Sequence, residues 1–343
     1  MQHFTGNVLD DKPRPFDNAM HVGWGSGSCY LNAALQFLFS AAQVRWILAE
    51  IISADVLRTN SFSEKRWRFC TTANISDIRS SKSTRNGFVN DRTLALTFAA
   101  SMQGRSSTGE SLRGLSLYPA LYLRENYDGR QEDATLFLMD CLDTSPRTLS
   151  LFTGRYRPAV LQCDVCGQAA PSGGHADERK FTTLQIQADF ADVQVALEAS
   201  YTETLDEEFL ECCTNPQCGH RWTHKHQVVE EPPRVLLMQI KRWDYSSGMP
   251  QRLASSMSLN SSIIVAGVTY HLHGIIYHNG DSPKSGHYVA AARHNTASDS
   301  FMVYNDAHRQ GVPVTTLAST MPLPGSWKCT LFHATTLLYE RAS

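Results

Sequence analysis

Residues 25–36 read GSGSCYLNAALQ, a turn of small residues that leads directly into an apolar helical pattern. Ser26 or Ser28 can cap the first turn of a helix that begins near Cys29. The dipole and the free N–H groups of a helix N-terminus favour a thiolate, which is the nucleophilic form of cysteine. Cys29 is therefore a candidate nucleophile. The alternative from the local sequence is a small cysteine buried in the first turn of a core helix.

The distribution of hydrophobic residues predicts an α+β fold. Residues 28–52 have helical periodicity, and further helices are predicted at 91–103, 115–127 and 131–142. After Leu151 the pattern changes to short alternating or β-branched runs. Because helices precede strands without regular alternation, a doubly wound sheet is not expected. The predicted strands are residues 157–161, 181–187, 227–229, 234–242, 261–264, 268–276, 288–293, 301–304 and 335–339.

Two later stretches contain candidate partners for a thiol nucleophile. His287 follows a glycine-rich loop and opens a strand pattern, which is where a base must project from a rigid element. Asn305 and Asp306 come at the end of the next strand pattern, and a returning strand would bring Asn305 beside His287. An amide or carboxylate there can fix the imidazole tautomer. Taken alone, these motifs have simpler explanations, a histidine at a strand start and an Asn-Asp turn.

Four cysteines have the spacing of zinc ligands. Cys163 and Cys166 form a C-x2-C pair, and Cys213 and Cys218 form a C-x4-C pair, each followed directly by glycine. Because the two pairs are far apart in sequence, they must meet at the end of a long ribbon. We expect one structural Zn²⁺, and unpaired surface thiols are the simpler alternative. Cys212 could replace Cys213, and one thiolate could be replaced by His220, His224 or His226.

The composition excludes several classes of protein. The 343 residues are 42% hydrophobic and 19% charged with a net charge of -2, so the chain can bury a core. It lacks the basic excess of nucleic-acid or membrane-surface binders, and we expect neither partner. No apolar run approaches the ~18–20 residues of a membrane span, and no secretory signal is visible. The nine cysteines are an odd number, which favours reduced thiols in a cytoplasmic and/or nuclear protein.

Taken together, the motifs resemble those of the ubiquitin-specific proteases, a family of papain-like cysteine deubiquitinases. Order and approximate spacing agree from about Val22 to Arg341, which is nearly the whole chain. The matching segments are the cysteine box at 29–36, the Gln-Gln-Asp-Ala helix at 131–134, the entry to the zinc ribbon at 151–154, the Pro-Pro…Leu-Lys-Arg-Phe strand at 232–243, the histidine box at 278–288, and the closing strands at 304–306 and 337–341.

The resemblance implies a papain-like core with a helical thumb, zinc-ribbon fingers and a β-rich palm. A lead-in of residues 1–20 would precede one catalytic domain, 21–343, with the thumb at about 21–150, the fingers at about 160–230 and the palm at about 231–343. Its partners would be ubiquitin and ubiquitinated proteins, and the sequence indicates no oligomeric state. Zinc would be structural, and catalysis would need no cofactor.

The resemblance also implies roles for individual residues. Cys29 would be the nucleophile, His287 its base, and Asn305 with Asp306 the groups that orient the imidazole. Gln131 and Asp133 match positions that contact the basic C-terminal tail of ubiquitin, where a carboxylate suits an arginine. Asp133 is also placed to favour a helix dipole.

Two positions before Cys29 depart from the family pattern. Trp24 stands where the family has an oxyanion-hole asparagine, and Ser26 stands where it has glycine. These departures leave open a catalytically weak or inactive ubiquitin-binding protein. A protease for a ubiquitin-like modifier or for a polyprotein junction is the other alternative.

Overall fold

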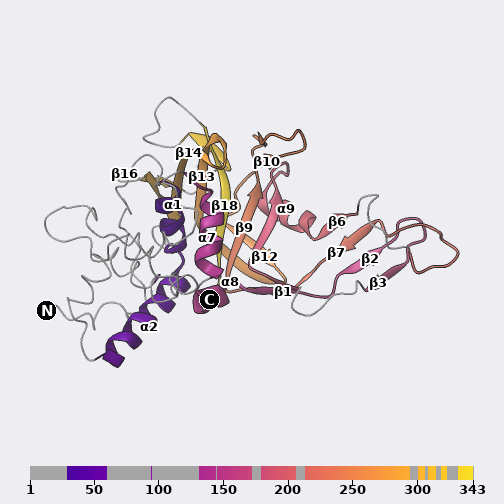
Figure 1. Cartoon of the computed structure of the whole chain (residues 1–343), viewed down its shortest axis with the longest axis horizontal. Coiled ribbons are helices and arrows are strands. Elements are labelled where there is room, and N and C mark those ends of the chain that lie inside the picture. Colours follow the sequence, from indigo (N-terminus) through magenta and orange to yellow (C-terminus); the bar gives the residue numbers. More distant parts are fainter. Residues whose placement is uncertain are drawn as a thin grey trace, which may run out of the picture.

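A computed structural model describes much of the chain after Ser28. Helices cover both sides of a large sheet, more of them on one side, and a narrow ribbon of strands extends away from it (Figure 1). The helix predicted at 115–127 lies outside the described residues. Of the helix predicted at 91–103, only Leu94 is described. The described residues are 29–59, 94, 131–143, 145–171, 179–205, 213–293, 300–305, 308–313, 318–322 and 331–342.

The predicted helix over residues 28–52 is two helices, α1 (Cys29–Leu38) and α2 (Ala42–Thr59). The chain bends between them because side chains bind the carbonyls at the bend. The Ser40 hydroxyl donates to the Phe37 carbonyl at 2.6 Å, and Arg45 donates to two bend carbonyls at 2.7 and 2.6 Å. These bonds satisfy acceptors that a helix end leaves open. Hydrophobic periodicity missed the bend because the apolar residues continue through it.

The helix predicted at 131–142 is confirmed as α7 (Ala134–Asp143). It begins later than predicted because Asp133 is its N-cap, with Oδ1 accepting the Thr135 N–H at 2.7 Å. A short helix that was not predicted, α8 (Pro146–Phe152), follows and carries proline in its first turn, where a missing N–H costs nothing. None of the described helices is both long and apolar enough to cross a membrane.

The described strands include a nine-stranded sheet that forms the centre of the molecule. Its order is β16-β15-β14-β13-β18-β9-β5, with β12 on β13 and β17 on β18, and only the β5–β9 pair is parallel. The bounds are β5 Thr183–Gln187, β9 Val235–Lys241, β12 Ser262–Val265, β13 Val268–Ser282, β14 Ser285–Arg293, β15 Ser300–Asn305, β16 His308–Pro313, β17 Thr320–Pro322 and β18 Leu331–Arg341.

Both faces of this sheet are buried. On β14, Tyr288 and Ala290 pack with α1 and α7, whereas Val289 and Ala291 pack in a second core on the other face. Successive strand residues point to opposite faces, so a strand covered on both faces is apolar throughout. Helix α9 (Val193–Ser200) contributes to the second core. The α+β prediction is confirmed, although β13 and β18 are longer than predicted and β16 and β17 were missed.

The ribbon consists of two smaller sheets. A three-stranded sheet has the order β4-β1-β8, and a four-stranded sheet at the far end has the order β3-β2-β7-β6 (Figure 1). The strands predicted at 157–161 and 227–229 are only partly right. Residues 157–159 and 227–228 are breaks, the first with Pro158, which lacks an N–H for a ladder, and the strands begin at Val160 and Val229. The bounds are β1 Gly154–Tyr156, β2 Val160–Gln162, β3 Ala169–Pro171, β4 Lys180–Phe181, β6 Thr202–Thr204, β7 His224–His226 and β8 Val229–Glu231.

Candidate active site and metal centre

Cys29 is the first residue of α1, where the sequence predicted a nucleophile. It is buried, with 5% of its surface exposed, and α1 packs directly on β14. The backbone N–H of Tyr288 on β14 points at the Cys29 sulfur, with 3.5 Å between nitrogen and Sγ. A backbone donor at this distance stabilises negative charge on sulfur. The thiol therefore lies beside the strand that carries His287. Trp24, Ser26 and Ser28 lie outside the described residues.

His287 and Asn305 are joined by a hydrogen bond. The distance from His287 Nε2 to Asn305 Oδ1 is 2.6 Å. An amide oxygen only accepts, so Nε2 carries the proton and Nδ1 is the basic nitrogen. The pairing follows from the antiparallel register of β14 and β15. Because Ala290 lies opposite Tyr304, Asn305 is a diagonal neighbour of His287 on the same face.

The imidazole has a second contact that restricts its orientation. Its ring meets the ring of Phe332 on β18 edge to face, with centroids 6.2 Å apart. A thiol, a neutral imidazole and an amide that orients it form the set of groups used in nucleophilic catalysis by cysteine. Asp306 lies outside the described residues, so its predicted role stays a prediction.

The segment before α7 places polar groups near the same strands. The Asp133 carboxylate caps α7, and burial raises its pKa although the Thr135 and Leu136 N–H groups lower it. The Gln131 Nε2 atom is buried and has no hydrogen-bond partner among the described residues. The two predicted substrate contacts therefore differ in their hydrogen bonding. Asp133 already accepts hydrogen bonds from the first turn of α7, whereas the Gln131 amide has an unused donor.

An ion pair that the sequence did not reveal joins this segment to the β13–β14 turn. The Lys284 Nζ lies 3.2 Å from a Glu132 carboxylate oxygen. Beside Lys284 in the same turn, the Pro283 carbonyl accepts a hydrogen bond from the Tyr288 hydroxyl at 2.8 Å. Burial raises the pKa of Tyr288, and the charge of Asp133 adds to this. Opposite charges so far apart in sequence have no local pattern, so only the fold brings them together.

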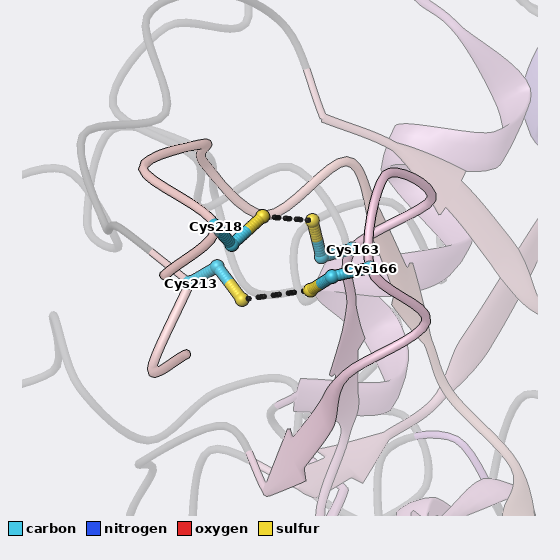
Figure 2. A group of neighbouring side chains, drawn as sticks. All are labelled: Cys163, Cys166, Cys213 and Cys218. Atoms are coloured by element: carbon cyan, nitrogen blue, oxygen red, sulfur yellow. Dashed lines mark hydrogen bonds between the residues drawn. The ribbon is translucent and has the colours of Figure 1, made fainter. Parts of the chain in front are cut away.

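The four predicted zinc ligands come together at the ribbon (Figure 2). The Sγ atoms are 3.7 Å apart for Cys163 and Cys218 and 3.5 Å apart for Cys166 and Cys213, and all four lie within 4.8 Å of one another. Zinc–sulfur bonds of about 2.3 Å in a tetrahedron place the sulfurs about 3.8 Å apart, so the cluster fits one zinc ion. Cys212 lies outside the described residues.

Two glycine turns shape this cluster. Gly167 and Gly219 have φ of +69° and +64°, a region that side chains disfavour, as the position after each cysteine pair predicted. The backbone N–H of Gln168 lowers the pKa of Cys166 to about 7. A hydrogen bond from His220 lowers the pKa of Cys218, but burial and the adjacent sulfurs outweigh it and raise the value to about 12. Four crowded sulfurs therefore need a cation before all can be thiolates.

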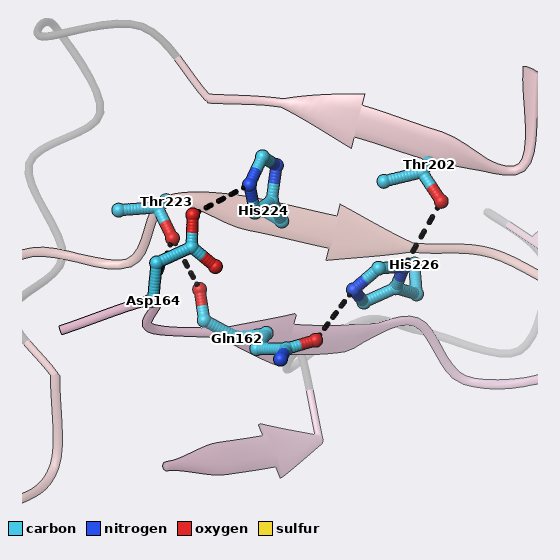
Figure 3. Close-up of polar contacts among 6 residues, drawn as sticks. All are labelled: Gln162, Asp164, Thr202, Thr223, His224 and His226. Carbon is cyan, nitrogen blue, oxygen red and sulfur yellow. Dashed lines mark hydrogen bonds and ion pairs between the residues drawn. The ribbon is translucent and has the colours of Figure 1, made fainter. Parts of the chain in front are cut away.

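The neighbouring histidines point elsewhere (Figure 3). His224 Nε2 lies 2.8 Å from the Asp164 carboxylate, and His226 Nε2 lies 2.8 Å from the Gln162 side-chain oxygen. The other nitrogen of His226 lies 3.1 Å from the Thr202 hydroxyl. The His226 contacts run across β2, β7 and β6, whereas Asp164 lies in the turn between Cys163 and Cys166, and among the described residues the four cysteines alone form the group that could hold a metal. Neither histidine therefore replaces a cysteine as a ligand.

Comparison with known proteins gives a consistent result. Residues 26–332 match the model of a family described as ubiquitin carboxyl-terminal hydrolase. A curated relative is the probable ubiquitin carboxyl-terminal hydrolase 3 of Schizosaccharomyces pombe, which is 24% identical over 147 residues. That alignment covers 39% of this chain and 28% of the relative, so the chain matches less than a third of the relative's length.

Two solved structures have the same fold. One is a chain of the SAGA DUB module Ubp8/Sgf11/Sus1/Sgf73 bound to monoubiquitin, with a TM-score of 0.63, 15% identity, and coverage of 96% of this chain and 70% of that chain. The other is the same module bound to ubiquitin aldehyde, with a TM-score of 0.65, 14% identity, and coverage of 97% and 71%. At this identity the likeness concerns the fold, and it confirms the papain-like α+β class predicted above.

Proposed function

The chain belongs to the ubiquitin carboxyl-terminal hydrolase family, and from that premise we propose that it is a cysteine-type deubiquitinase. The proposed reaction is hydrolysis of the isopeptide or peptide bond after the C-terminal glycine of ubiquitin. Its partners are then ubiquitin and ubiquitinated proteins. The observation that carries the proposal is the placement of Cys29 against β14, the strand that also holds the His287–Asn305 pair.

The geometry suggests a role for each group. His287 Nδ1 takes the proton of Cys29, and the sulfur attacks the glycine carbonyl carbon. The tetrahedral intermediate collapses to a thioester while the imidazolium gives its proton to the leaving lysine amine. His287 then removes a proton from water, whose oxygen attacks the thioester carbon, and the expelled sulfur takes that proton back from the imidazolium as the carboxylic acid is released. Asn305 keeps Nε2–H engaged throughout, and the Cys29 backbone N–H at the start of α1 is one donor for the oxyanion. We propose Asp306 as a second orienting group.

The acidic segment before α7 supports a basic substrate tail. Glu132 and Asp133 place two carboxylates near β14, and the unused Gln131 donor suits a backbone carbonyl of an extended peptide. We propose Gln131 and Asp133 as contacts to the C-terminal tail of ubiquitin. Glu132 is a further candidate, because an arginine of the tail can displace Lys284 from it.

We propose that Cys163, Cys166, Cys213 and Cys218 hold one structural zinc ion. The support is the sulfur–sulfur spacing and the pair of glycine turns. When bound, zinc supplies a cross-link between the two turns and takes no part in proton transfer. The site lies at the ribbon, and the candidate catalytic groups lie on α1 and the central sheet (Figure 1).

We also propose residues 21–343 as one catalytic domain. The helices up to residue 152 support a thumb, the ribbon supports fingers at about 160–230, and β9 to β18 support a palm from about 231. Strand β5 falls within the fingers range but pairs with β9, so the fingers consist of two excursions, one between α8 and β5 and one between β5 and β9.

The test is labelling with ubiquitin that carries a C-terminal electrophile. We expect one adduct at Cys29, none in Cys29→Ala, and release of a fluorogenic leaving group from a ubiquitin conjugate. Binding of ubiquitin without an adduct would select the inactive, ubiquitin-binding alternative. An adduct with a ubiquitin-like modifier but not with ubiquitin would select the other alternative.

A further inference from the structure

We propose that Arg252 and His278 are positioning residues that hold the β13–β14 hairpin and thereby place His287. This inference rests on the proposed function, because it assigns His287 the part of the base. The two side chains lie outside the group formed by Cys29, His287 and Asn305. They bind two backbone carbonyls of the hairpin at the point where its strands approach most closely, just before His287.

The His278 ring uses both of its nitrogens in this contact. Its side chain is buried, with 1% of the residue exposed. Nε2 lies 3.0 Å from the Ser285 carbonyl oxygen, and Nδ1 lies 3.1 Å from Arg252 Nη2. A carbonyl only accepts and a guanidinium only donates, so one neutral tautomer satisfies both bonds. Burial, and next the charge of Arg252, lower the His278 pKa to about 3, so the ring stays neutral at physiological pH.

Arg252 connects the hairpin to a part of the molecule outside the main sheet. It belongs to β11 (Gln251–Arg252), which pairs with β10 (Trp243–Asp244) in a separate two-stranded sheet. Its guanidinium lies 4.9 Å from the centroid of the Trp243 ring, a cation–π contact. The same Nη2 atom that binds His278 also donates to the carbonyl of Gly280. Arg252 therefore holds one hairpin strand while His278 holds the other.

The hairpin needs this support because its own ladder is interrupted. Asn279 lies opposite His287, but the register shifts between Asn279 and the Ser282–Ser285 pair. At such an irregularity regular cross-strand hydrogen bonds are lost. The two strands also approach very closely, since a side chain on Gly280 would collide with the Ser285 carbonyl. The interruption lies at Gly280 and Ser285, and these are the residues whose carbonyls bind Arg252 and His278.

The same contacts reach the candidate nucleophile. The His278 ring packs at a tilt against the Tyr288 ring with 4.3 Å between centroids, and the Tyr288 N–H points at the Cys29 sulfur. A shift of the hairpin therefore moves His287 and the donor to Cys29 together. Misplacing a reacting group by about 1 Å can cost roughly 100-fold in rate.

The experiment measures alkylation of Cys29 by iodoacetamide against pH, read by mass spectrometry of the Cys29 peptide. This readout needs no ubiquitin and reports how well His287 stabilises the thiolate. In Arg252→Met we expect the midpoint of the alkylation profile to rise by about one pH unit or more, because the imidazolium partner is displaced. For a fluorogenic ubiquitin conjugate we expect kcat to fall roughly 10–100-fold and KM to change less than about threefold.

Two further variants make the result specific. Arg252→Lys keeps the positive charge and one donor group, so we expect it to recover part of both effects. Arg234→Met is the matched control, because Arg234 is exposed and precedes β9 at the end of the sheet away from the hairpin, and we expect wild-type behaviour. If Arg252→Met does not fold, Arg252→Lys decides, and a wild-type profile and kcat in that variant overturn the proposal.

His287→Ala separates this inference from the proposed function. If His287→Ala shifts the alkylation profile and Arg252→Met does not, only the positioning role is wrong. If His287→Ala leaves the profile unchanged, the Cys–His pair itself is wrong and the positioning role is overturned with it.

Discussion

The central sheet and the ribbon hold their functional side chains in different ways. Cys29, His287 and Asn305 sit on elements whose two faces are buried in large hydrophobic clusters. The hydrophobic cluster of the ribbon has four buried members, Cys163, Cys213, Leu161 and Trp222, whereas Cys218 packs against it and Cys166 is exposed. The core therefore positions the active site, whereas in the ribbon the ligands themselves make up half of the buried core. Only the ribbon should depend on a metal for its structure.

The largest effect is expected for the nucleophile. Cys29→Ala should abolish hydrolysis of a ubiquitin conjugate, because the Cys29 sulfur lies against β14, the strand that carries the proposed base. Alanine suits a helix and removes only one small group, so the fold should persist. Zinc content and the unfolding temperature are the controls, and both should match wild type. Turnover that survives in Cys29→Ala would refute the assignment.

Loss of a metal ligand should affect the ribbon but not the active site on the central sheet. Cys213→Ser should lose zinc by elemental analysis and weaken ubiquitin binding about tenfold or more, because the ribbon loses its cross-link. Alkylation of Cys29 should be unchanged, since the sheet does not use the metal. Cys141→Ser is the matched control, as Cys141 is also buried but lies in α7. Zinc retained at full occupancy in Cys213→Ser would contradict the comparison.

A graded loss is expected for the base and its orienting group. His287→Ala should abolish measurable turnover, and Asn305→Ala should lower kcat by a smaller factor, roughly 10-fold to 100-fold, because water can replace the amide. The acid limb of the pH–rate profile should shift in Asn305→Ala, since the tautomer is no longer fixed. Equal losses in both variants would show that Asn305 does more than orient the ring.

The smallest effect concerns acid stability of the sheet. Burial, and next Arg293 and Arg45, lower the pKa of His273 from 6.5 to about 3. The unfolded chain therefore binds a proton at His273 more readily than the folded protein does. The free energy of unfolding is highest above pH 6.5, where the ring is neutral in both states, and it declines as the pH falls toward 3. The decline is about 1.4 kcal/mol per pH unit.

The measurement is the unfolding temperature between pH 7 and 4, and His273→Gln should have the flatter profile. Glu340 faces His273 at 3.5 Å, and burial raises its pKa, so protonation of Glu340 reduces the decline at the lower end. Parallel profiles for the two proteins would show that acid acts first elsewhere, for example by releasing zinc from the ribbon.

The sequence predicted those features that depend on short local motifs. The start of α1 at Cys29, the pairing of His287 with Asn305 and the two cysteine pairs all follow from local patterns and strand geometry. The sequence did not predict features whose deciding contact joins distant segments. The bend after α1 depends on Arg45, and the Glu132–Lys284 pair crosses from helix to hairpin. Such contacts leave no periodicity, so they become visible only when the fold is known.

The parallel pairing of β5 with β9 implies that the ribbon is an insertion that can vary in length. The chain runs into the ribbon after α8, enters the sheet as β5, leaves it and returns as β9. Each excursion ends on a strand whose register is set by its neighbours in the sheet. Residues can therefore be added to or removed from the far end of either excursion without shifting β9, β13 or β14. We expect relatives to differ most in size here, so the ribbon is an exchangeable recognition module on an unchanged catalytic frame.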